Sequence, residues 1–315
     1  MRRRKGNNCM KNQWTGFLAL LMAICLAVGS GIPASAAVSA TAQANAYNKH
    51  SIGLTGVSNA RELGGYKTKD GRTVKFGKLL RTGDLSDMTA ADKKRLVQKY
   101  RPVKVVDFRS NRDLLTSSAD PQLGHAENVR YAYSSFRSYL FTPAVVTNSV
   151  DYVTALVRQE NKGLLVYQEQ KDSYGAMFTS EDGIAMFRGF FDALLDADGG
   201  TVLFHCAGGK DRTGNAAMLL LTVLGVDRKT ILADYLLSND YAAADRKEAY
   251  DLAYRLTGNK RIATDIELSK GVHRDWLEAS YETIESRYGS VENYLHKIIG
   301  LSNNDFKQLQ KAYLK

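Results

Sequence analysis

The spacing of apolar residues along the chain differs before and after residue 205. A short β-branched and aromatic run at 201–204 follows the turn residues at 198–200, which is typical of a buried strand. From Thr213 to Leu224 the apolar residues recur every three or four positions, and Gly225 follows as a helix stop. A second run at 103–108 resembles the first. The pattern predicts two buried strands, with a turn and a helix after the later one.

Helical spacing dominates the rest of the chain. Ser290 and Gly300 delimit the clearest case, and Ser302 with Asp305 is a capping signal for the last helix. Thr89 with Asp92 marks an earlier helix start, whereas the stretch 164–167 is ambiguous between strand and helix end. Asp70-Gly71 indicates a hairpin turn. Further helices are expected at 150–157, 184–195, 230–237, 241–256, 276–288, 291–299 and 305–313. We therefore expect an α/β fold, with a central, mostly parallel sheet flanked by helices and a helical C-terminal part.

The first 36 residues have the pattern of a secretory signal peptide. Basic residues precede an apolar stretch at 17–28, and Ala34-Ser35-Ala36 matches a cleavage site. Residues 37–56, rich in Ala, Ser, Thr and Asn, are predicted to be a flexible lead-in, and 57–315 a single domain. The sequence thus predicts a bacterial protein that is secreted or extracytoplasmic, with no stable membrane span after cleavage.

Removal of the predicted signal changes the charge and the cysteine count. The formal net charge of +10 falls to about +5, because five basic residues and no acidic ones lie before residue 37. This balance suits anionic substrates, but no basic run with interleaved aromatic residues suggests nucleic-acid binding. Cys206 remains as the single thiol, so no internal disulfide is possible.

The ten residues 205–214, H-C-A-G-G-K-D-R-T-G, connect the predicted strand to the predicted helix. A loop that opens onto a helix N-terminus presents unpaired amides and favours an anion. Gly208 and Gly209 allow the backbone to curl so that these amides converge. The electropositive turn favours the thiolate of Cys206, and Arg212 can bind a phosphate through two donors. This combination suits phosphoryl transfer. A zinc site lacks further ligands at suitable spacing, and a cysteine protease is disfavoured because His205 is adjacent to the cysteine.

This loop resembles that of the protein tyrosine phosphatase superfamily, and its H-C-x-x-G-K-D-R-T-G form resembles the bacterial atypical tyrosine/lipid phosphatases. Further similar segments are N-A-R-E-L-G-G at 59–65, R-T-G-D-L at 81–85, D-F-R-S at 107–110, D-Y-L-L-S-N at 234–239 and Y-G-S-x-x-x-Y at 288–294. The resemblance covers about residues 57–315 and implies a tyrosine-phosphatase-like fold.

The resemblance implies roles for the loop residues. Cys206 would be the nucleophile, Arg212 would hold the phosphoryl oxygens, and His205 would orient the cysteine. The backbone or side chains of the remaining loop residues would bind the substrate: Ala207, Gly208, Gly209, Lys210 and Thr213. Neither a metal nor another cofactor is expected, since Arg212 and the amides supply positive charge.

The general acid is the least defined role. The W-P-D motif of ordinary tyrosine phosphatases is absent, so the K-D-R form implies Asp211, with Asp107 as the alternative. The resemblance also places Asp107 and Arg109 beside the loop as substrate-binding residues. Their alternative is a structural ion pair.

Two further groups of residues allow two interpretations each. Arg61, Arg81 and Asp84 belong either to a solvated hairpin edge or to the pocket rim. An aromatic stretch belongs either to the core or to a substrate cleft, and comprises Tyr131, Tyr133, Phe136, Tyr139, Leu140 and Phe141.

The sequence predicts a secreted phosphomonoester hydrolase, a protein-tyrosine phosphatase acting on a phosphotyrosine protein or peptide through a phosphocysteine. One alternative is a phosphoinositide or inositol-phosphate phosphatase, for which Lys210 is favourable and Ala207 is not, because lipid phosphatases commonly carry a lysine after the cysteine. The other is an inactive phosphate-binding module, which would usually have lost Cys206 or Arg212.

Overall fold

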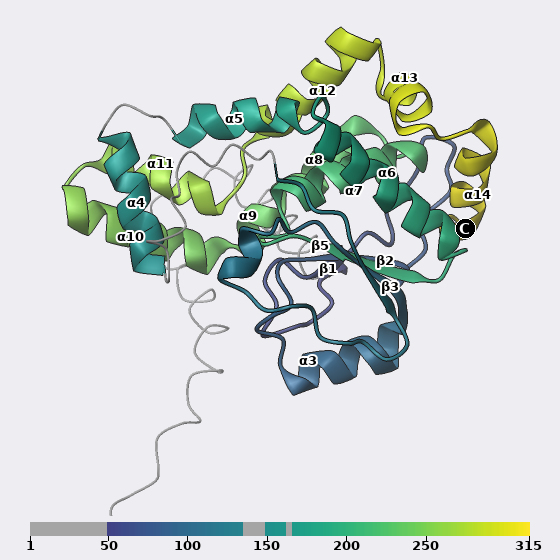
Figure 1. Cartoon of the computed structure of the whole chain (residues 1–315), viewed down its shortest axis with the longest axis horizontal. Helices are drawn as coiled ribbons and strands as arrows, with labels where there is room; N and C mark the ends of the chain where they lie inside the picture. The colour runs from purple at the N-terminus through teal and green to yellow at the C-terminus, as the bar shows by residue number, and fades with distance from the viewer. Residues whose placement is uncertain (1–48, 135–148, 162–165) are drawn as a thin grey trace, which may run out of the picture. The chain divides into compact units, whose positions relative to one another are not determined.

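A computed structural model describes residues 49–134, 149–161 and 166–315 of the chain (Figure 1). These residues belong to one compact unit, 46–315. The predicted signal peptide, most of the lead-in and the first two residues of the ambiguous stretch 164–167 lie outside the described residues, whereas residues 166 and 167 are helical. His50 and Ile52 are already buried, so packing begins before the boundary expected at residue 57.

One five-stranded sheet forms the centre of this unit, in the order β1-β2-β5-β3-β4 (Figure 1). Its strands are β1 Arg61–Glu62, β2 Leu79–Thr82, β3 Pro102–Asp107, β4 Glu127–Arg130 and β5 Thr201–His205. Only the β1–β2 pair is antiparallel. The expectation of a mostly parallel sheet flanked by helices is therefore confirmed. The central strand β5 is buried throughout, as expected for a parallel sheet that is covered on both faces.

Alternating strand residues supply two apolar cores. Val202 and Phe204 face a core built with α6 Glu181–Asp196, α7 Asp211–Val223, α12 Arg274–Tyr288 and α14 Asn303–Tyr313. Leu203 faces the opposite core, to which the π-helical turn Leu96–Tyr100 contributes; this turn directly follows α3 Ala90–Arg95. Figure 1 shows α3 across the sheet from α6 and α7. Burial on both faces fixes the register of β5, and hence the position at which the following loop begins.

The remaining helices extend the unit on the side of α6 and α7. They are α4 Ser149–Glu160, α5 Val166–Ala176, α8 Arg228–Leu236, α9 Ser238–Tyr241, α10 Ala243–Thr257, α11 Lys260–Lys270 and α13 Val291–Tyr294; two short turns are Asp113–Leu115 and Leu295–Ile299. A third apolar cluster joins α4, α10 and α11. The helix predicted at 241–256 is divided at Ala242, and α11 was not predicted.

The capping signals read from the sequence are confirmed at Thr89, Ser290, Gly300 and Ser302. Thr89 with Asp92 and Ser302 with Asp305 form complete capping boxes. Gly300, with a φ of 96°, ends the π-helical turn that precedes α14. The Asp70-Gly71 turn closes a hairpin through the Lys67–Thr73 bridge.

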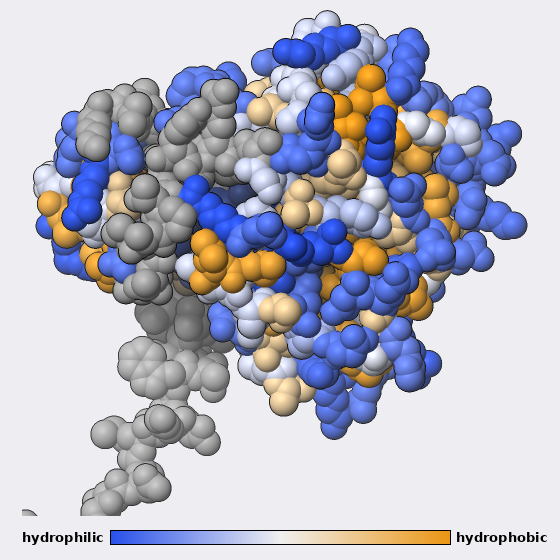
Figure 2. All heavy atoms as spheres, in the orientation of Figure 1, coloured by the Kyte–Doolittle hydropathy of each residue, from blue (hydrophilic) through white to orange (hydrophobic). Residues whose placement is uncertain are grey.

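The surface is mixed in character. On the face drawn in Figure 2, hydrophilic side chains surround separate hydrophobic areas. Within the described ranges, no helix is both long and apolar enough to span a bilayer.

Candidate active site

The loop after β5 is attached to the scaffold through its carbonyl groups. Asp84 donates its amide to the Ala207 carbonyl at 2.9 Å. Asn59 Nδ2 donates to the carbonyls of Gly208 and Gly209 at 3.2 and 2.8 Å, and Arg81 donates to Gly209 at 3.0 Å. These contacts turn three successive carbonyl groups of the loop towards the scaffold.

The amide groups of the same loop remain unused. Among the described residues, no acceptor takes a hydrogen bond from the amides of residues 207–212. The last of these amides belong to the first turn of α7, where the helix dipole adds positive potential. The loop therefore has the properties of a preformed anion site, because its acceptors are occupied and its donors are free.

Arg212 lies in the first turn of α7, and residues that follow β3 orient its side chain. Its Nη1 atom donates to the Phe108 carbonyl at 3.0 Å and lies 2.7 Å from Asp113 Oδ2, while Nη2 lies 3.4 Å from Oδ1. Burial works against the charged guanidinium, but the neighbouring Cys206 and Asp113 raise the pKa of Arg212 above its ordinary value. Arg212 thus stays cationic, and a two-point ion pair fixes its plane.

Cys206 begins the loop at the carboxyl end of β5 and is buried. His205, just before it, points its ring into the scaffold, with Nε2 2.8 Å from Asp120 Oδ2 and Nδ1 3.4 Å from the Cys206 carbonyl. The ring therefore contacts the backbone of Cys206 and an acidic neighbour. This arrangement supports an orienting role for His205.

Asp234 and two arginines form a buried network behind the loop. Arg61 Nε lies 3.1 Å from Asp234 Oδ1, and Arg81 Nη1 lies 2.6 Å from Oδ2. Burial would raise the pKa of Asp234, yet the two guanidinium groups lower it to about 2. Arg61 also donates to the Asn59 side chain, which in turn holds the loop.

The hairpin-edge interpretation is wrong for Arg61 and Arg81, because neither is exposed. Both act behind the loop, where the carboxylate of Asp234 compensates their charge. Asp84 is partly exposed and, through its amide, holds Ala207.

Arg109 forms a second network at the end of β3. Its guanidinium is bonded to Asp107 at 3.0 Å, to Asp84 at 2.7 Å and to Asp120 at 2.6 Å. Arg109 is fully buried, and its donors are directed at these carboxylates and at Ser117 and Ser118. For Asp107 and Arg109 the geometry favours the structural ion pair over substrate contact.

This second network also contains the one group of possible metal ligands found among the described residues. Ligand atoms of Asp107, Asp120 and His205 lie within 4.8 Å of one another. Arg109 already compensates both carboxylates. We therefore assign these residues to the ion-pair network.

The other loop side chains have distinct environments. Asp211 accepts a hydrogen bond from Tyr174 at 2.6 Å on Oδ1. Lys210 donates to the carbonyls of Ser269 and Gly271, the latter at 2.8 Å. The buried Thr213 hydroxyl has no hydrogen-bond partner in the described part of the chain. The loop thus presents a carboxyl with Tyr174 at Oδ1 and the Lys210 ammonium 4.0 Å from Oδ2, a lysine bound to the segment after α11, and a hydroxyl without a partner.

The aromatic stretch is described only in part. Tyr133 is fully buried in the core, and Tyr131 packs against it partly exposed. The core interpretation is correct for Tyr133. Phe136, Tyr139, Leu140 and Phe141 lie outside the described residues.

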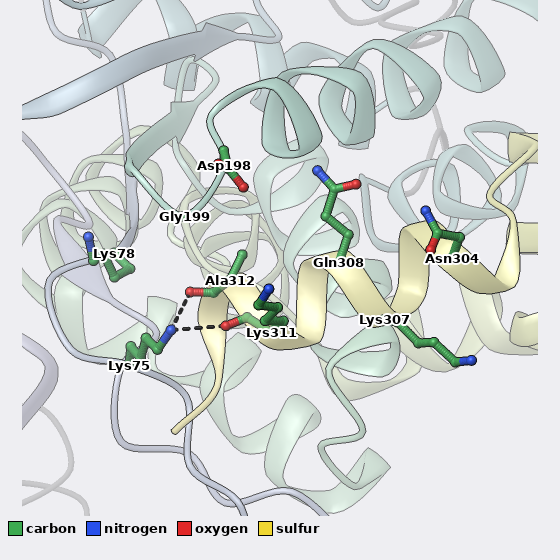
Figure 3. Close-up of a pocket in the computed structure, with 9 residues that line it drawn as sticks. All are labelled: Lys75, Lys78, Asp198, Gly199, Asn304, Lys307, Gln308, Lys311 and Ala312. Atoms are coloured by element: carbon green, nitrogen blue, oxygen red, sulfur yellow. Dashed lines mark hydrogen bonds between the residues drawn. The ribbon is translucent and has the colours of Figure 1, made fainter.

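A separate hollow of about 670 Å³ lies between α14 and the turn before β5 (Figure 3). Lys75, Lys78, Lys307 and Lys311 are among its lining residues. The Lys75 ammonium donates to the last carbonyls of α14, at 3.0 and 2.7 Å. It therefore caps this helix C-terminus, a structural role.

Sequence reasoning assigned no role to several residues that the structure brings to the loop. Asp113 lies 99 residues before its partner Arg212, and Tyr174 lies 37 residues before Asp211. Asp234 belongs to a segment that carried the family resemblance, and this was the available signal for it. No signal in the sequence pointed to Asp113 or Tyr174.

The strand, the loop and the helix together form an anion site beside the Cys206 thiol. The tyrosine phosphatase family matches residues 52–315, and the chain belongs to this family. The match confirms the predicted superfamily and the enzyme class, a protein-tyrosine phosphatase.

Three relatives agree with this assignment. A protein of Cupriavidus necator, named as a candidate tyrosine-protein phosphatase, is 31% identical over 92% of this chain and 96% of its own length. The triple specificity protein phosphatase PtpB of Mycobacterium tuberculosis is 36% identical over 32% of this chain and 40% of its own. A tyrosine-protein phosphatase of Nostoc commune is 32% identical over 39% of this chain and 42% of its own.

Proposed function

We propose that this phosphatase hydrolyses phosphotyrosine in proteins or peptides through a phosphocysteine on Cys206. The observation that carries the proposal is the loop itself, with carbonyls bonded outward and the six amides of residues 207–212 free beside Arg212. Donors held in place before the reaction stabilise charge as it develops on the phosphoryl oxygens.

In the first step the Cys206 thiolate attacks phosphorus, a sulfur–phosphorus bond forms and the bond to the ester oxygen breaks. Asp211 gives its proton to the departing oxygen. The equatorial oxygens are held by the amides and by Arg212, which Asp113 keeps in plane. Because tyrosine is a better leaving group than an aliphatic alcohol, the need for the acid depends on the substrate.

In the second step water attacks the phosphocysteine and gives a proton to the Asp211 carboxylate. The sulfur–phosphorus bond breaks and the thiolate returns. Thr213 supports this step, since its buried hydroxyl has no other partner among the described residues and can donate to the leaving sulfur. Inorganic phosphate is then released.

A second substrate class is a phosphoinositide or an inositol phosphate such as phytate. The resemblance to a triple specificity phosphatase is the observation that favours a wider substrate range. Against it, Lys210 is bonded to the Ser269 and Gly271 carbonyls and is not free for a ring phosphate.

The test is a substrate panel run on wild type and on Cys206→Ser. It comprises a phosphotyrosine peptide, a phosphoserine peptide, phosphoinositide in vesicles and phytate. We expect the highest kcat/KM for phosphotyrosine, a burst of one leaving group per Cys206, and no turnover by Cys206→Ser. Preference for the lipid or for phytate would replace the tyrosine assignment, and the absence of turnover by wild type on every substrate of the panel would indicate a phosphate-binding module.

We further propose that the chain is exported and cleaved after Ala36. The support is the sequence of residues 1–36, with its basic start, apolar stretch and A-x-A site. Expression of the full chain in a bacterial host should give extracytoplasmic protein whose mass corresponds to residues 37–315. Full-length protein retained in the cytoplasm would contradict the proposal.

A further inference from the structure

Two buried tyrosines, Tyr235 and Tyr174, form a chain of hydrogen bonds that ends at Asp211. Tyr235 donates its hydroxyl to the Tyr174 oxygen at 2.7 Å, and Tyr174 donates to Asp211 Oδ1 at 2.6 Å. Both tyrosine side chains are almost fully buried, whereas Asp211 reaches solvent with about 14% of its side-chain surface. The path thus runs from the core to the one carboxyl of the loop 205–214, which is partly exposed.

The two rings are held by packing on every side. Tyr174 comes from α5 and Tyr235 from α8, and their rings meet edge to face with centroids 6.1 Å apart. Tyr174 also packs against the buried Trp276 of α12, at 5.9 Å. Gly214 lets α7 approach Tyr235, because a Cβ atom there would lie 3.0 Å from the ring. Neither hydroxyl can turn away without disturbing several helices.

We propose that Tyr174 and Tyr235 are positioning residues that hold the Asp211 carboxyl and direct its Oδ2 atom to the leaving-group oxygen. The inference rests on the proposed role of Asp211 as general acid. An oxygen that accepts a short bond from a phenol is the unprotonated one, so the transferable proton lies on Oδ2. A carboxyl group that is held in one rotamer already has the geometry needed for proton transfer, which is the advantage of a positioned group.

The charge state of the tyrosines suits this role. Burial raises the pKa of both Tyr174 and Tyr235 well above the ordinary value of 10, and the nearby carboxylate of Asp211 adds to the effect. Both phenols therefore stay protonated donors over the whole working pH range. A hydrogen bond donated by a phenol favours the charged form of the carboxylate that accepts it.

Tyr174→Phe tests the proposal, because it removes one hydroxyl and keeps the ring. We expect kcat/KM for an alkyl phosphate to fall about tenfold, a part of the full effect of general acid catalysis. An aryl phosphate with an acidic phenol should change less than about twofold, since its leaving group needs little proton transfer. The basic limb of the kcat/KM profile should move to higher pH.

Tyr235→Phe is the second variant, and it should change the same quantities in the same direction by a smaller factor. Tyr313→Phe is the matched control, because this buried tyrosine also loses a hydrogen bond, to the Leu194 carbonyl at 3.1 Å, away from the loop. It should leave the leaving-group dependence and the pH profile unchanged. If Tyr174→Phe does not fold, Tyr235→Phe decides the matter by the same readouts.

Equal losses on both substrate types, or an unchanged pH profile in Tyr174→Phe and Tyr235→Phe, would overturn the proposal. Asp211→Asn distinguishes this failure from a failure of the proposed function. If Asp211→Asn discriminates between the substrates and the tyrosine variants do not, only the positioning role is wrong. If Asp211→Asn does not discriminate either, the acid lies elsewhere. In the double variant Asp211→Asn/Tyr174→Phe we expect no further loss, because the two residues act as one unit.

Discussion

The carboxylate of Asp234 lies 2.6 Å from the guanidinium of Arg81, and neither side chain is exposed by more than 1%. Arg81 also donates to the Gly209 carbonyl, so a residue of α8 holds the loop 205–214 through a single arginine. Buried charges of this kind are costly to separate, because a partner left alone cannot regain water. The position of the loop and the stability of the fold therefore depend on the same ion pair.

Asp234→Asn should lower the free energy of unfolding by about 3–5 kcal/mol at pH 7, since two buried arginines lose their counter-charge. The pKa of Asp234 is lowered from 3.8 to about 2, so its stabilising effect is present above pH 4 and is lost as the pH falls towards 2. Urea unfolding should thus show the difference between variant and wild type shrinking below pH 4. Asp305→Asn, at an exposed helix cap, is the control and should cost about 1 kcal/mol. A loss from Asp234→Asn that is no larger than the control's would contradict the prediction.

Gly209→Ala should abolish measurable turnover. Gly209 has φ of +61°, and a Cβ atom there would collide with the Thr82 carbonyl and the Gly83 amide. Gly208→Ala is the matched control, because its Cβ would meet only the flexible Lys210 side chain at 3.4 Å or more. We expect Gly208→Ala to keep kcat/KM within about tenfold of wild type. Comparable activity in both variants would show that the loop has another active conformation.

Asp113→Asn should lower kcat/KM about tenfold through the loss of the charged partner that orients Arg212. The loss should be equal for aryl and alkyl phosphates, because in the proposed mechanism Arg212 binds the phosphoryl group and not the leaving group. A leaving-group series measures this directly, with the exposed Asp87→Asn as control. A loss confined to alkyl phosphates would instead make Asp113 part of the acid machinery.

Asp211→Asn should show the opposite selectivity. We expect kcat/KM to fall about 100-fold or more for alkyl phosphates and much less for aryl phosphates with acidic phenols. The basic limb of the profile should flatten, because it reports deprotonation of the acid. Unchanged profiles for both substrate types would remove Asp211 from this role and return attention to Asp107.

We expect Asp265 on α11 to make the stability of the neighbouring helices depend on pH. Burial and the neighbouring Glu160 raise the pKa of Asp265 from 3.8 to about 7. A raised pKa in the folded state means stability that is full below pH 4 and is lost as the pH rises towards 7. Asp265→Asn should therefore unfold at a higher temperature than wild type at pH 8 and show no such gain at pH 4. A gain of equal size at both pH values would contradict this assignment.

The strand, turn and helix around residues 205–214 could be predicted from the sequence because their signals are local. The apolar run of β5, the two glycines and the spacing of α7 lie within about 25 residues, so strand, turn and helix follow from adjacent positions. The same is true of the caps at Thr89 and Ser302, which need only a partner three residues later.

The support of the loop could not be predicted in this way. Arg61 and Arg81 are charged residues in short strands, a pattern that indicates exposure unless the partner is known. Their partner Asp234 lies more than 150 residues later. The helix α11 was missed for a related reason. Its few buried apolar residues, such as Ile262 and Ile266, face α4 and α10, and the rest of its surface is polar.

The position of Cys206 offers a practical way to count working enzyme. After residue 25 the chain contains no other cysteine, so protein shortened to residues 37–315 carries one sulfhydryl, at the base of the loop. Alkylation by iodoacetamide would then consume one equivalent per competent molecule, with no background from elsewhere in the polypeptide. Inorganic phosphate in the loop should protect against it, so a single titration would give both the active fraction of a preparation and the occupancy of its pocket.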